Sequence, residues 1–377
     1  MIKRVYAKNY RSLAEVEVSL DRLTILVGPN GSGKSNFVDV LRFISDALKR
    51  GMEYALDERE GIETLRRQDP LRPYDIEIES EIEDKNIKGK YRVHLKPPKA
   101  QEIDTLVNYE IKRESCDFEL ETESLNFEVA NGKWVEKPKW VKIEPTSTDL
   151  ILPLLTTKPF NEIVDYFKGM TFYNIYPNIM RIPTKVGSEY PLESDGRNIA
   201  SVLRSMQRKK NIRLGDIKEA LGVVVSGLTD VKIVKVGGFL RLKFKHEYKN
   251  KKAQEFEAYQ ESDGTLRVLG ILVALFQDPP PELLVIEEPE LTVHPGVLAV
   301  LADLIREASL KRSQVIVTTH SPDLISKFSA KDLRVVAWNY KDGTTISPVD
   351  ENQIELINEK LFSSGDLLRI EGLRAQH

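Results

Sequence analysis

The sequence of 377 residues has a single cysteine, Cys116, so it can form no disulfide within the chain and no thiolate metal site. We therefore expect a reducing, cytoplasmic setting. An excess of one charge is also lacking, because 55 Lys and Arg residues stand against 58 Asp and Glu residues, a formal net charge of −3. Bulk positive charge cannot hold a nucleic acid here, and any such contact must be local.

Long apolar runs are absent as well. The longest uncharged apolar run is Val268–Gln277, whereas a membrane-spanning helix needs about 20 residues. The first residues show no apolar stretch of signal-peptide length. We expect no membrane contact and interpret the run as a buried helix. A composition of 41% hydrophobic and 30% charged residues is typical of a globular protein with a full core.

The first half of the chain favours β-structure around one helix. Short runs of β-forming residues cover 2–7, 14–20 and 23–27. A glycine-rich turn and a helical apolar pattern follow, with Phe37, Leu41, Ile44 and Leu48 spaced by 4, 3 and 4. From about residue 74 to 143, polar and apolar residues alternate, which predicts an antiparallel sheet with one wet face.

The second half changes its pattern twice. Residues from about 145 to 227 are mixed, with a helix predicted over 195–206. Strands are predicted over 230–236, 239–246 and 255–260, and then helix and strand alternate, which indicates a parallel sheet covered by helices. The predicted fold is α/β, divided into 1–145 with a β-rich subdomain, 146–228 as a mixed, partly helical insertion, and 229–377.

The strongest motif is Gly28-Pro-Asn-Gly-Ser-Gly-Lys34-Ser35, which matches G-x-x-x-x-G-K-[ST] between a strand and a helix. Its glycines let backbone amides surround a phosphate at a helix N-terminus. In this interpretation Lys34 neutralises the β- and γ-phosphates and Ser35 binds Mg²⁺. The residues that we expect to contact the nucleotide here are Asn30, Gly31, Ser32, Gly33, Lys34 and Ser35.

Two later strands end in polar side chains. Leu283–Ile286 is followed by Glu287 and Glu288, so both carboxylates are expected at the edge of a parallel sheet. Glu287 would support Mg²⁺, and Glu288 would orient or deprotonate the attacking water. Val315–Thr318 is followed by His320, which we expect on the neighbouring strand tip, near the γ-phosphate.

A fourth motif, Ser262-Asp-Gly264-Thr265, precedes the apolar helix and allows two interpretations. Ser262 or Asp263 can simply cap the helix, which is worth about 1 kcal/mol. The same geometry also exposes amides and a hydroxyl that suit a γ-phosphate.

Together the four motifs resemble the ABC-type ATPase heads of the SMC/RecF superfamily, in the order Walker A, signature, Walker B and switch histidine. The stretch Glu288-Pro-Glu-Leu-Thr-Val-His294-Pro resembles the "EEPExxLHP" stretch of RecF-like and OLD-like prokaryotic ATPases. The sequence departs from the family in Glu287, where many relatives have Asp, and in its Ser-Asp-Gly-Thr signature. Gln68 lies at a plausible distance for the Q-loop, but a surface glutamine is an equal alternative.

The resemblance implies that ATP and Mg²⁺ bind between two heads of a homodimer. Ser262 and Gly264 of one subunit would then reach the γ-phosphate held by Lys34 of the other. It also implies that Arg11 lies near the nucleotide and that His294 belongs to a D-loop that crosses the dimer interface. The dimer would close when ATP binds, and hydrolysis at Glu288 would open it again.

The resemblance leaves the purpose of the ATPase open between two classes. One is a DNA-associated ATPase of repair, recombination or anti-phage defence; the other is a regulatory subunit for a protein effector such as a nuclease or toxin, without DNA contact. Basic stretches at 204–213 and 243–252 are candidate DNA contacts, but both are short enough to be solvated faces, which is the favoured interpretation. A transporter is disfavoured by the β-rich insert, and an OLD-type nuclease by the approximately 40 residues after Trp338, too few for a further metal-binding domain.

Overall fold

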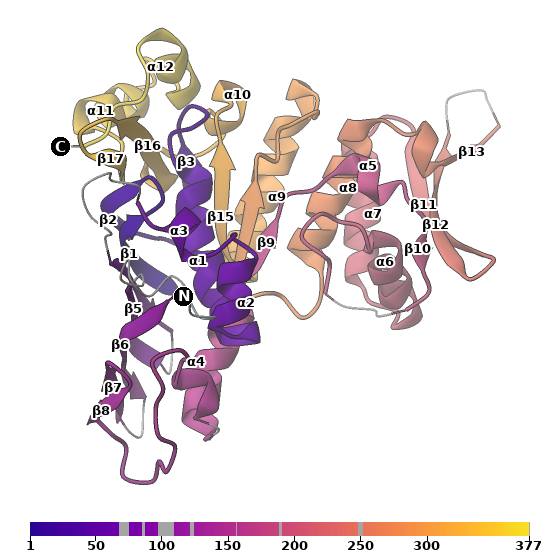
Figure 1. The fold of residues 1–377 in the computed structure, drawn as a ribbon. Helices are drawn as coiled ribbons and strands as arrows, with labels where there is room; N and C mark the ends of the chain where they lie inside the picture. Colours follow the sequence, from indigo (N-terminus) through magenta and orange to yellow (C-terminus); the bar gives the residue numbers. More distant parts are fainter. Residues whose placement is uncertain are drawn as a thin grey trace. The chain divides into compact units, whose positions relative to one another are not determined.

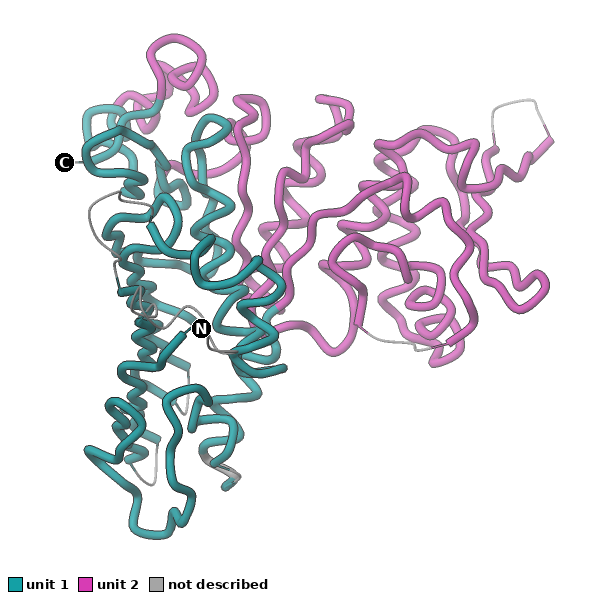
Figure 2. The backbone as a smooth tube through the Cα atoms, in the orientation of Figure 1, with its two compact units in different colours: residues 1–170, 331–355, 373–377 teal, residues 171–330, 356–372 magenta. Residues whose placement is uncertain are grey.

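A computed structural model describes residues 1–67, 75–84, 87–96, 109–120, 124–155, 157–187, 191–247 and 252–376. Gln68 and the Tyr248–Lys251 part of the second basic stretch lie outside these residues. The chain forms two compact units (Figure 2): unit 1 comprises residues 1–170, 331–355 and 373–377, and unit 2 comprises 171–330 and 356–372. The division into three parts predicted above was based on the order of the sequence motifs, whereas these units are defined by contacts within the structure. That division stays a prediction.

Unit 1 is built on a series of paired strands, most of them labelled in Figure 1. Their spatial order is β8-β7-β6-β5-β4-β1-β2-β17-β16-β3, and of these pairs only β16–β3 is parallel. The strands are β1 Ile2–Tyr10, β2 Leu13–Ser19, β3 Leu23–Val27, β4 Ile76–Glu83, β5 Ile87–Lys96, β6 Glu110–Leu120, β7 Ser124–Ala130, β8 Lys133–Glu136, β16 Leu333–Asn339 and β17 Gly343–Pro348.

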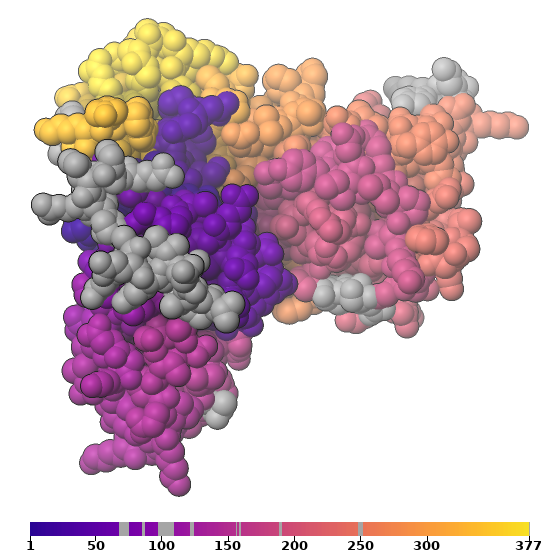
Figure 3. All heavy atoms as spheres, viewed as in Figure 1, coloured from indigo at the N-terminus to yellow at the C-terminus, as the bar shows by residue number. Residues whose placement is uncertain are grey.

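The β-rich part of unit 1 confirms the predicted antiparallel sheet. In β4, Ile76, Ile78 and Ile82 are buried while Glu83 is exposed, as an alternating pattern requires. The last strand ends at Glu136, seven residues earlier than predicted, and Pro138 follows, which cannot donate to a strand ladder. In the space-filling view of Figure 3, this part forms one continuous end of unit 1.

The helix after the glycine-rich turn, α1 Lys34–Arg50, buries Phe37, Leu41, Ile44 and Leu48, as predicted. It packs against α4, and Ser45 Oγ donates to the Phe167 carbonyl at 2.9 Å. The remaining described helices of unit 1 are α2 Met52–Asp57, α3 Ile62–Leu65, a 3₁₀ turn Leu152–Leu154 and α4 Lys158–Lys168; α11 Glu351–Asn358 begins in this unit.

Unit 2 contains a parallel sheet of β9 Thr171–Tyr173, β14 Leu283–Glu287 and β15 Gln314–Thr319, with β14 paired to both others. Helix α8 Asp263–Phe276 is buried at every position from Thr265 to Phe276, which confirms the predicted buried helix. Later along the chain, unit 2 contains a 3₁₀ turn at Pro295–Val297 and the helices α9 Leu298–Lys311, α10 Pro322–Ile325 and α12 Ser364–Ile370.

A second, antiparallel sheet in unit 2 joins β10 Thr184–Lys185, β11 Leu228–Val236, β12 Phe239–His246 and β13 Gln254–Glu257. Helices α5 Pro177–Met180, α6 Ile199–Arg208 and α7 Arg213–Val224 belong to the same unit.

Two predicted boundaries were wrong. The helix expected from Asp195 begins at Ile199, because the Asp195 carboxylate accepts from the Arg197 amide in a turn. The strand expected to reach Gln260 ends at Glu257, which caps a 3₁₀ turn.

No helix among these described segments is long and apolar enough to cross a bilayer.

Candidate functional site

The glycine-rich loop of unit 1 joins a fully buried strand, β3, to the N-terminus of α1. Gly31 and Gly33 have φ angles of +79° and +105°, in the left-handed region that favours glycine. Gly33 is the N-cap of α1, where it offers no side-chain hydrogen bond, and the first turn holds no acidic residue. The first amides of α1 and the positive end of its dipole can therefore receive an anion.

Lys34 lies inside this loop. Its side chain is buried, and its Nζ atom donates to the carbonyls of Gly28 at 2.7 Å and Pro29 at 2.9 Å. Both acceptors belong to the loop itself, so the ammonium group sits at the centre of the turn rather than in solvent. A phosphate held by the loop amides would meet that charge directly.

The other loop residues fit a polyphosphate with Mg²⁺. Asn30, Gly31 and Ser35 are exposed, and the Ser35 hydroxyl follows the lysine as a ligand of a phosphate-bound cation requires. Ser32 Oγ is buried and has no hydrogen-bond partner. A buried hydroxyl without a partner is rare in folded proteins, so this atom is a donor suited to a bound anion.

Strand β17 supports the loop from behind, a contact that the sequence analysis missed. Thr344 is fully buried, and its hydroxyl donates to the Ser32 carbonyl at 2.9 Å. Ser12 Oγ lies 2.7 Å from the same hydroxyl and accepts from Asn36 Nδ2 at 2.6 Å. A Cβ atom on Gly33 would stand 2.2 Å from Thr344 Oγ1, so close packing as well as φ requires glycine there.

Arg11, expected near the nucleotide, lies in the β1–β2 turn with φ of +47°. Its guanidinium pairs with Asp39 of α1 at 3.2 Å. Asp39 also accepts from Arg59 at 3.0 Å and from the buried Tyr10 hydroxyl at 2.7 Å, and burial raises the pKa of Tyr10 well above its ordinary value. Asp39 therefore anchors this turn to α1, and the contact of Arg11 with a nucleotide stays a prediction.

Glu287 is the last residue of the buried strand β14, and Glu288 follows it. Glu287 and Glu288 are half-buried, and the parallel register places Glu287 opposite Thr318 of β15. Glu288 has a φ of +45°, and its amide donates to the Thr318 carbonyl at 2.9 Å. A non-glycine residue held in this conformation carries local strain, which concentrates at functional sites.

His320 lies beside Glu288, at the end of the neighbouring strand. Its Nδ1 atom is 3.3 Å from Glu288 Oε1 and 4.0 Å from Glu290 Oε1. The structure thus brings together the two residues that the sequence assigned to catalysis. Glu290 was not singled out, although its spacing from Glu288 was visible in the sequence.

Two buried charges support this pair, and neither was predicted as a site residue. Glu290 Oε1 accepts from the Thr319 hydroxyl at 2.5 Å, and burial raises the pKa of this carboxyl. Arg267 of α8 is also buried, which lowers its pKa, and its Nη1 reaches the Glu288 carbonyl at 3.4 Å. An arginine inside an otherwise apolar helix was the signal available in the sequence.

In the signature region, Ser262 is the exposed N-cap of α8. Its hydroxyl accepts from the Thr265 amide at 3.1 Å, so the capping interpretation holds within this chain. Gly264 packs closely, since a Cβ atom there would lie 2.6 Å from the Thr292 carbonyl oxygen. His294 is exposed, and its Nδ1 accepts from the Gly296 amide at 3.1 Å.

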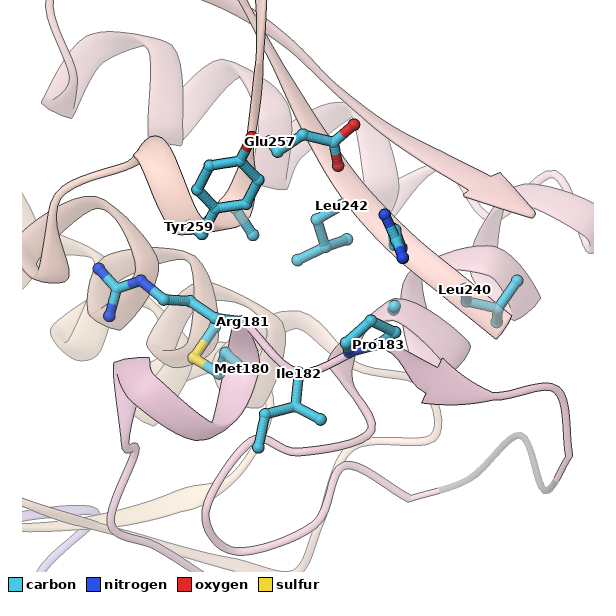
Figure 4. A pocket seen from close by; sticks show the side chains of 11 residues that line it. Met180, Arg181, Ile182, Pro183, Leu240, Leu242, Glu257 and Tyr259 are labelled. Atoms are coloured by element: carbon cyan, nitrogen blue, oxygen red, sulfur yellow. The ribbon is translucent and has the colours of Figure 1, made fainter. Parts of the chain in front are cut away.

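A pocket in unit 2 lies close to the signature (Figure 4). Ile182 and Tyr259 line it and are strongly exposed, and Arg181 stands between them. The Arg181 guanidinium donates to the Glu261 carbonyl at 2.9 Å and pairs with Asp263 at 2.7 Å. The wall of the pocket is thereby tied to the first residues of α8.

Comparison with known proteins identifies the family. Residues 23–326 match the family described as "AAA domain, putative AbiEii toxin, Type IV TA system". The chain belongs to this AAA family. The matched range contains the glycine-rich loop, the turn at Ser262, the two glutamates Glu287 and Glu288, and His320.

Relatives of this AAA domain include the OLD nuclease of Thermus scotoductus (strain ATCC 700910 / SA-01), 25% identical over 381 residues. That alignment covers 93% of this chain, and the chain spans 65% of the length of the relative. Among solved structures, an Smc head bound to the C-winged helix domain of ScpA matches with a TM-score of 0.56 at 16% identity, covering 94% of this chain and 99% of that one.

A second Smc head, with an extended coiled coil and bound to the C-terminal domain of ScpA derived from Pyrococcus furiosus, matches with a TM-score of 0.52 at 13% identity. It covers 96% of this chain and 99% of the other. These likenesses concern the fold. They confirm the predicted α/β fold, which is that of an Smc head.

Within the described residues of the AAA domain, no group of three or more His, Cys, Asp or Glu side chains is arranged to hold a metal ion. The first basic stretch spans the end of α6 and the start of α7, with Arg208, Lys209 and Lys210 exposed. In the second, Lys243 pairs with Glu257 and Lys245 with Glu247, so these charges are largely neutralised.

Proposed function

We propose that this chain binds ATP with Mg²⁺ and hydrolyses it. The observation that carries the proposal is the loop of unit 1. Its glycines adopt left-handed conformations, Lys34 lies inside the turn, and the helix N-terminus behind it has no cap. That combination provides the amides and the charge that a triphosphate needs.

The roles of the remaining residues follow from their chemistry. Ser35 and Glu287 would hold Mg²⁺, which polarises the phosphoryl oxygens when bound. Glu288 would accept the proton of the attacking water, and its strained backbone, held by β15, fixes the carboxylate for that task. His320 would donate to the γ-phosphate from the side of its ring opposite Glu288.

A homodimer is the second part of the proposal. Ser262 is exposed at the start of α8 and Gly264 permits close approach, so this turn can meet a γ-phosphate bound to a second copy. His294 is exposed on the loop after Glu288, which suits a residue that contacts the partner. The dimer would close on ATP and open after hydrolysis.

A role in DNA repair, recombination or defence is the first candidate for the purpose of this cycle. The similarity to a protein named OLD nuclease supports a nucleic-acid context. Control of a protein effector without DNA contact is the second candidate. It is favoured by the basic stretch on β12, where the described lysines are paired with glutamates.

Hydrolysis and binding assays test the proposed ATPase and distinguish its two candidate roles. The wild-type chain should release phosphate from ATP in a Mg²⁺-dependent manner, and Lys34→Ala should lose nucleotide binding in a titration. Stimulation by single-stranded, double-stranded or nicked DNA would favour the first candidate, and the same rate with all three would favour the second. Normal nucleotide affinity in Lys34→Ala would contradict the assignment of the loop.

A further inference from the structure

Three buried polar atoms without hydrogen-bond partners gather at the ends of β14 and β15. They are Arg267 Nε, Glu290 Oε2 and His320 Nδ1, and further such atoms, Ser32 Oγ among them, occur elsewhere in the described residues. Folded proteins leave few buried polar atoms unpaired, because each costs about 1–3 kcal/mol. Their concentration beside Glu288 points to a task that requires charged groups at this place.

Glu290 holds the end of β15 through Thr319. The Thr319 hydroxyl donates to Glu290 Oε1 at 2.5 Å and accepts from the Ser321 amide at 3.0 Å. The two bonds bracket the backbone of His320, which lies between Thr319 and Ser321. Since the Glu290 side chain is only 7% exposed, it has little freedom to release this hydroxyl.

The orientation of the His320 ring follows from the same contacts. Its Nδ1 atom is buried and faces two carboxylates, Glu288 Oε1 at 3.3 Å and Glu290 Oε1 at 4.0 Å. The side chain as a whole is 39% exposed, so the exposed edge is the one that carries Nε2. Neighbouring carboxylates favour a proton on Nδ1.

We propose that Glu290 is a positioning residue, which with Thr319 fixes the ring and the Nδ1-protonated form of His320 so that Nε2 faces the phosphate. Arg267 brings a positive charge to the cluster through its contact with the Glu288 carbonyl at 3.4 Å, from a helix whose N-cap is Ser262. The expected effect on the rate rests on the proposed ATPase function. The orientation of the His320 ring can be measured without ATP hydrolysis.

Variants that keep the shape of the cluster test the proposal. Glu290→Gln retains an acceptor for Thr319 but removes the charge, and Thr319→Val removes the hydroxyl at nearly constant volume. We expect each to lower kcat for ATP about tenfold, with KM changed less than about twofold. This is less than the roughly 10²–10⁴-fold contribution of an acid–base group itself, because Glu290 and Thr319 act only through His320. Thr319→Ser should recover most of the rate, which a loss of packing alone would not allow.

A second measurement does not depend on ATP hydrolysis. In ¹⁵N-histidine-labelled protein, the ring nitrogens of His320, assigned by their loss in His320→Asn, should show the Nδ1-protonated form. Glu290→Gln should shift those signals toward the other tautomer, while circular dichroism remains that of the wild type. Unchanged His320 signals in Glu290→Gln, or a Thr319→Ser variant no faster than Thr319→Val, would overturn the inference.

The two proposals fail separately. A wild-type chain that hydrolyses no ATP but shows the tautomer shift contradicts the ATPase and retains the positioning role. A wild-type chain that hydrolyses ATP at the rate of Glu290→Gln contradicts the positioning role and retains the ATPase.

Discussion

At the scale of single residues, the glycine-rich loop depends on a threonine more than three hundred positions away in the chain. Thr344 donates to the Ser32 carbonyl, and its Oγ1 lies 2.7 Å from Ser12 Oγ, so one hydroxyl connects the loop with the β1–β2 turn. Arg11 belongs to the same turn. The loop and its neighbouring arginine are thus held by a common support.

Thr344→Val should weaken that support with little change in volume. The Ser32 carbonyl would lose its partner in a buried place, which costs about 1–3 kcal/mol of stability, and ATP affinity should fall several-fold as the loop loosens. Urea unfolding and a nucleotide titration measure the two effects. Thr345→Val, at the half-buried neighbouring position, is the matched control. It loses only an exposed hydrogen bond to the Ala337 carbonyl at 3.4 Å, so both quantities should change much less; equal behaviour of the two variants would refute the support role.

Residues of a contiguous motif could be predicted, and their supporting partners could not. Lys34 is placed by the loop on either side of it, so local sequence fixes its position. Thr344 and Glu290 act through contacts with distant segments, and nothing adjacent in the sequence distinguishes them from ordinary buried or capping side chains. Polar residues within apolar runs, such as Arg267, were the available signal.

At the scale of elements, Glu114 of β6 connects the β-rich sheet to the 3₁₀ turn 152–154. This carboxyl group is buried and accepts from the Ile151 amide at 2.6 Å, the Leu152 amide at 3.0 Å and the Tyr91 hydroxyl at 2.9 Å. Burial is the largest influence on it and raises the pKa of Glu114 to about 7.

The raised pKa predicts a pH-dependent stability. Between an unfolded value of 4.5 and a folded value of about 7, the folded chain holds a proton that the unfolded chain has released. The free energy of unfolding should therefore fall as pH rises through this window, by about 3 kcal/mol. Urea unfolding from pH 5 to 8 measures the slope. In Glu114→Gln this contribution should vanish; an identical slope in the variant would assign the effect to other groups.

Element types were more predictable than element ends. The spacing of apolar residues in α1 and the alternation in β4 each reflect a buried face, which any fold must satisfy. Boundaries at Ile199 and Glu257 depend on single side-chain hydrogen bonds in turns, which compete with the helix or strand and leave little trace in periodicity.

At the scale of the whole molecule, the proposed cycle predicts a change in mass. Glu288→Gln should bind ATP without hydrolysing it, so the closed dimer should persist, and light scattering should report about twice the 43.0 kDa of one chain. The double variant Lys34→Ala with Glu288→Gln should stay monomeric in ATP. A constant mass for Glu288→Gln with saturating ATP would exclude the clamp.

The chain leaves unit 1 at residue 170 and returns to it at residue 331, so the strands of this unit come from distant parts of the sequence. Strand β16 is the parallel neighbour of β3, and a Cβ atom on Gly28 would lie 2.1 Å from the Val336 carbonyl oxygen. During synthesis, the glycine-rich loop therefore emerges from the ribosome long before the strands that shape it. A nascent chain should remain unable to capture nucleotide until residues 333–348 have been translated, which would protect the cell from half-made molecules that consume ATP.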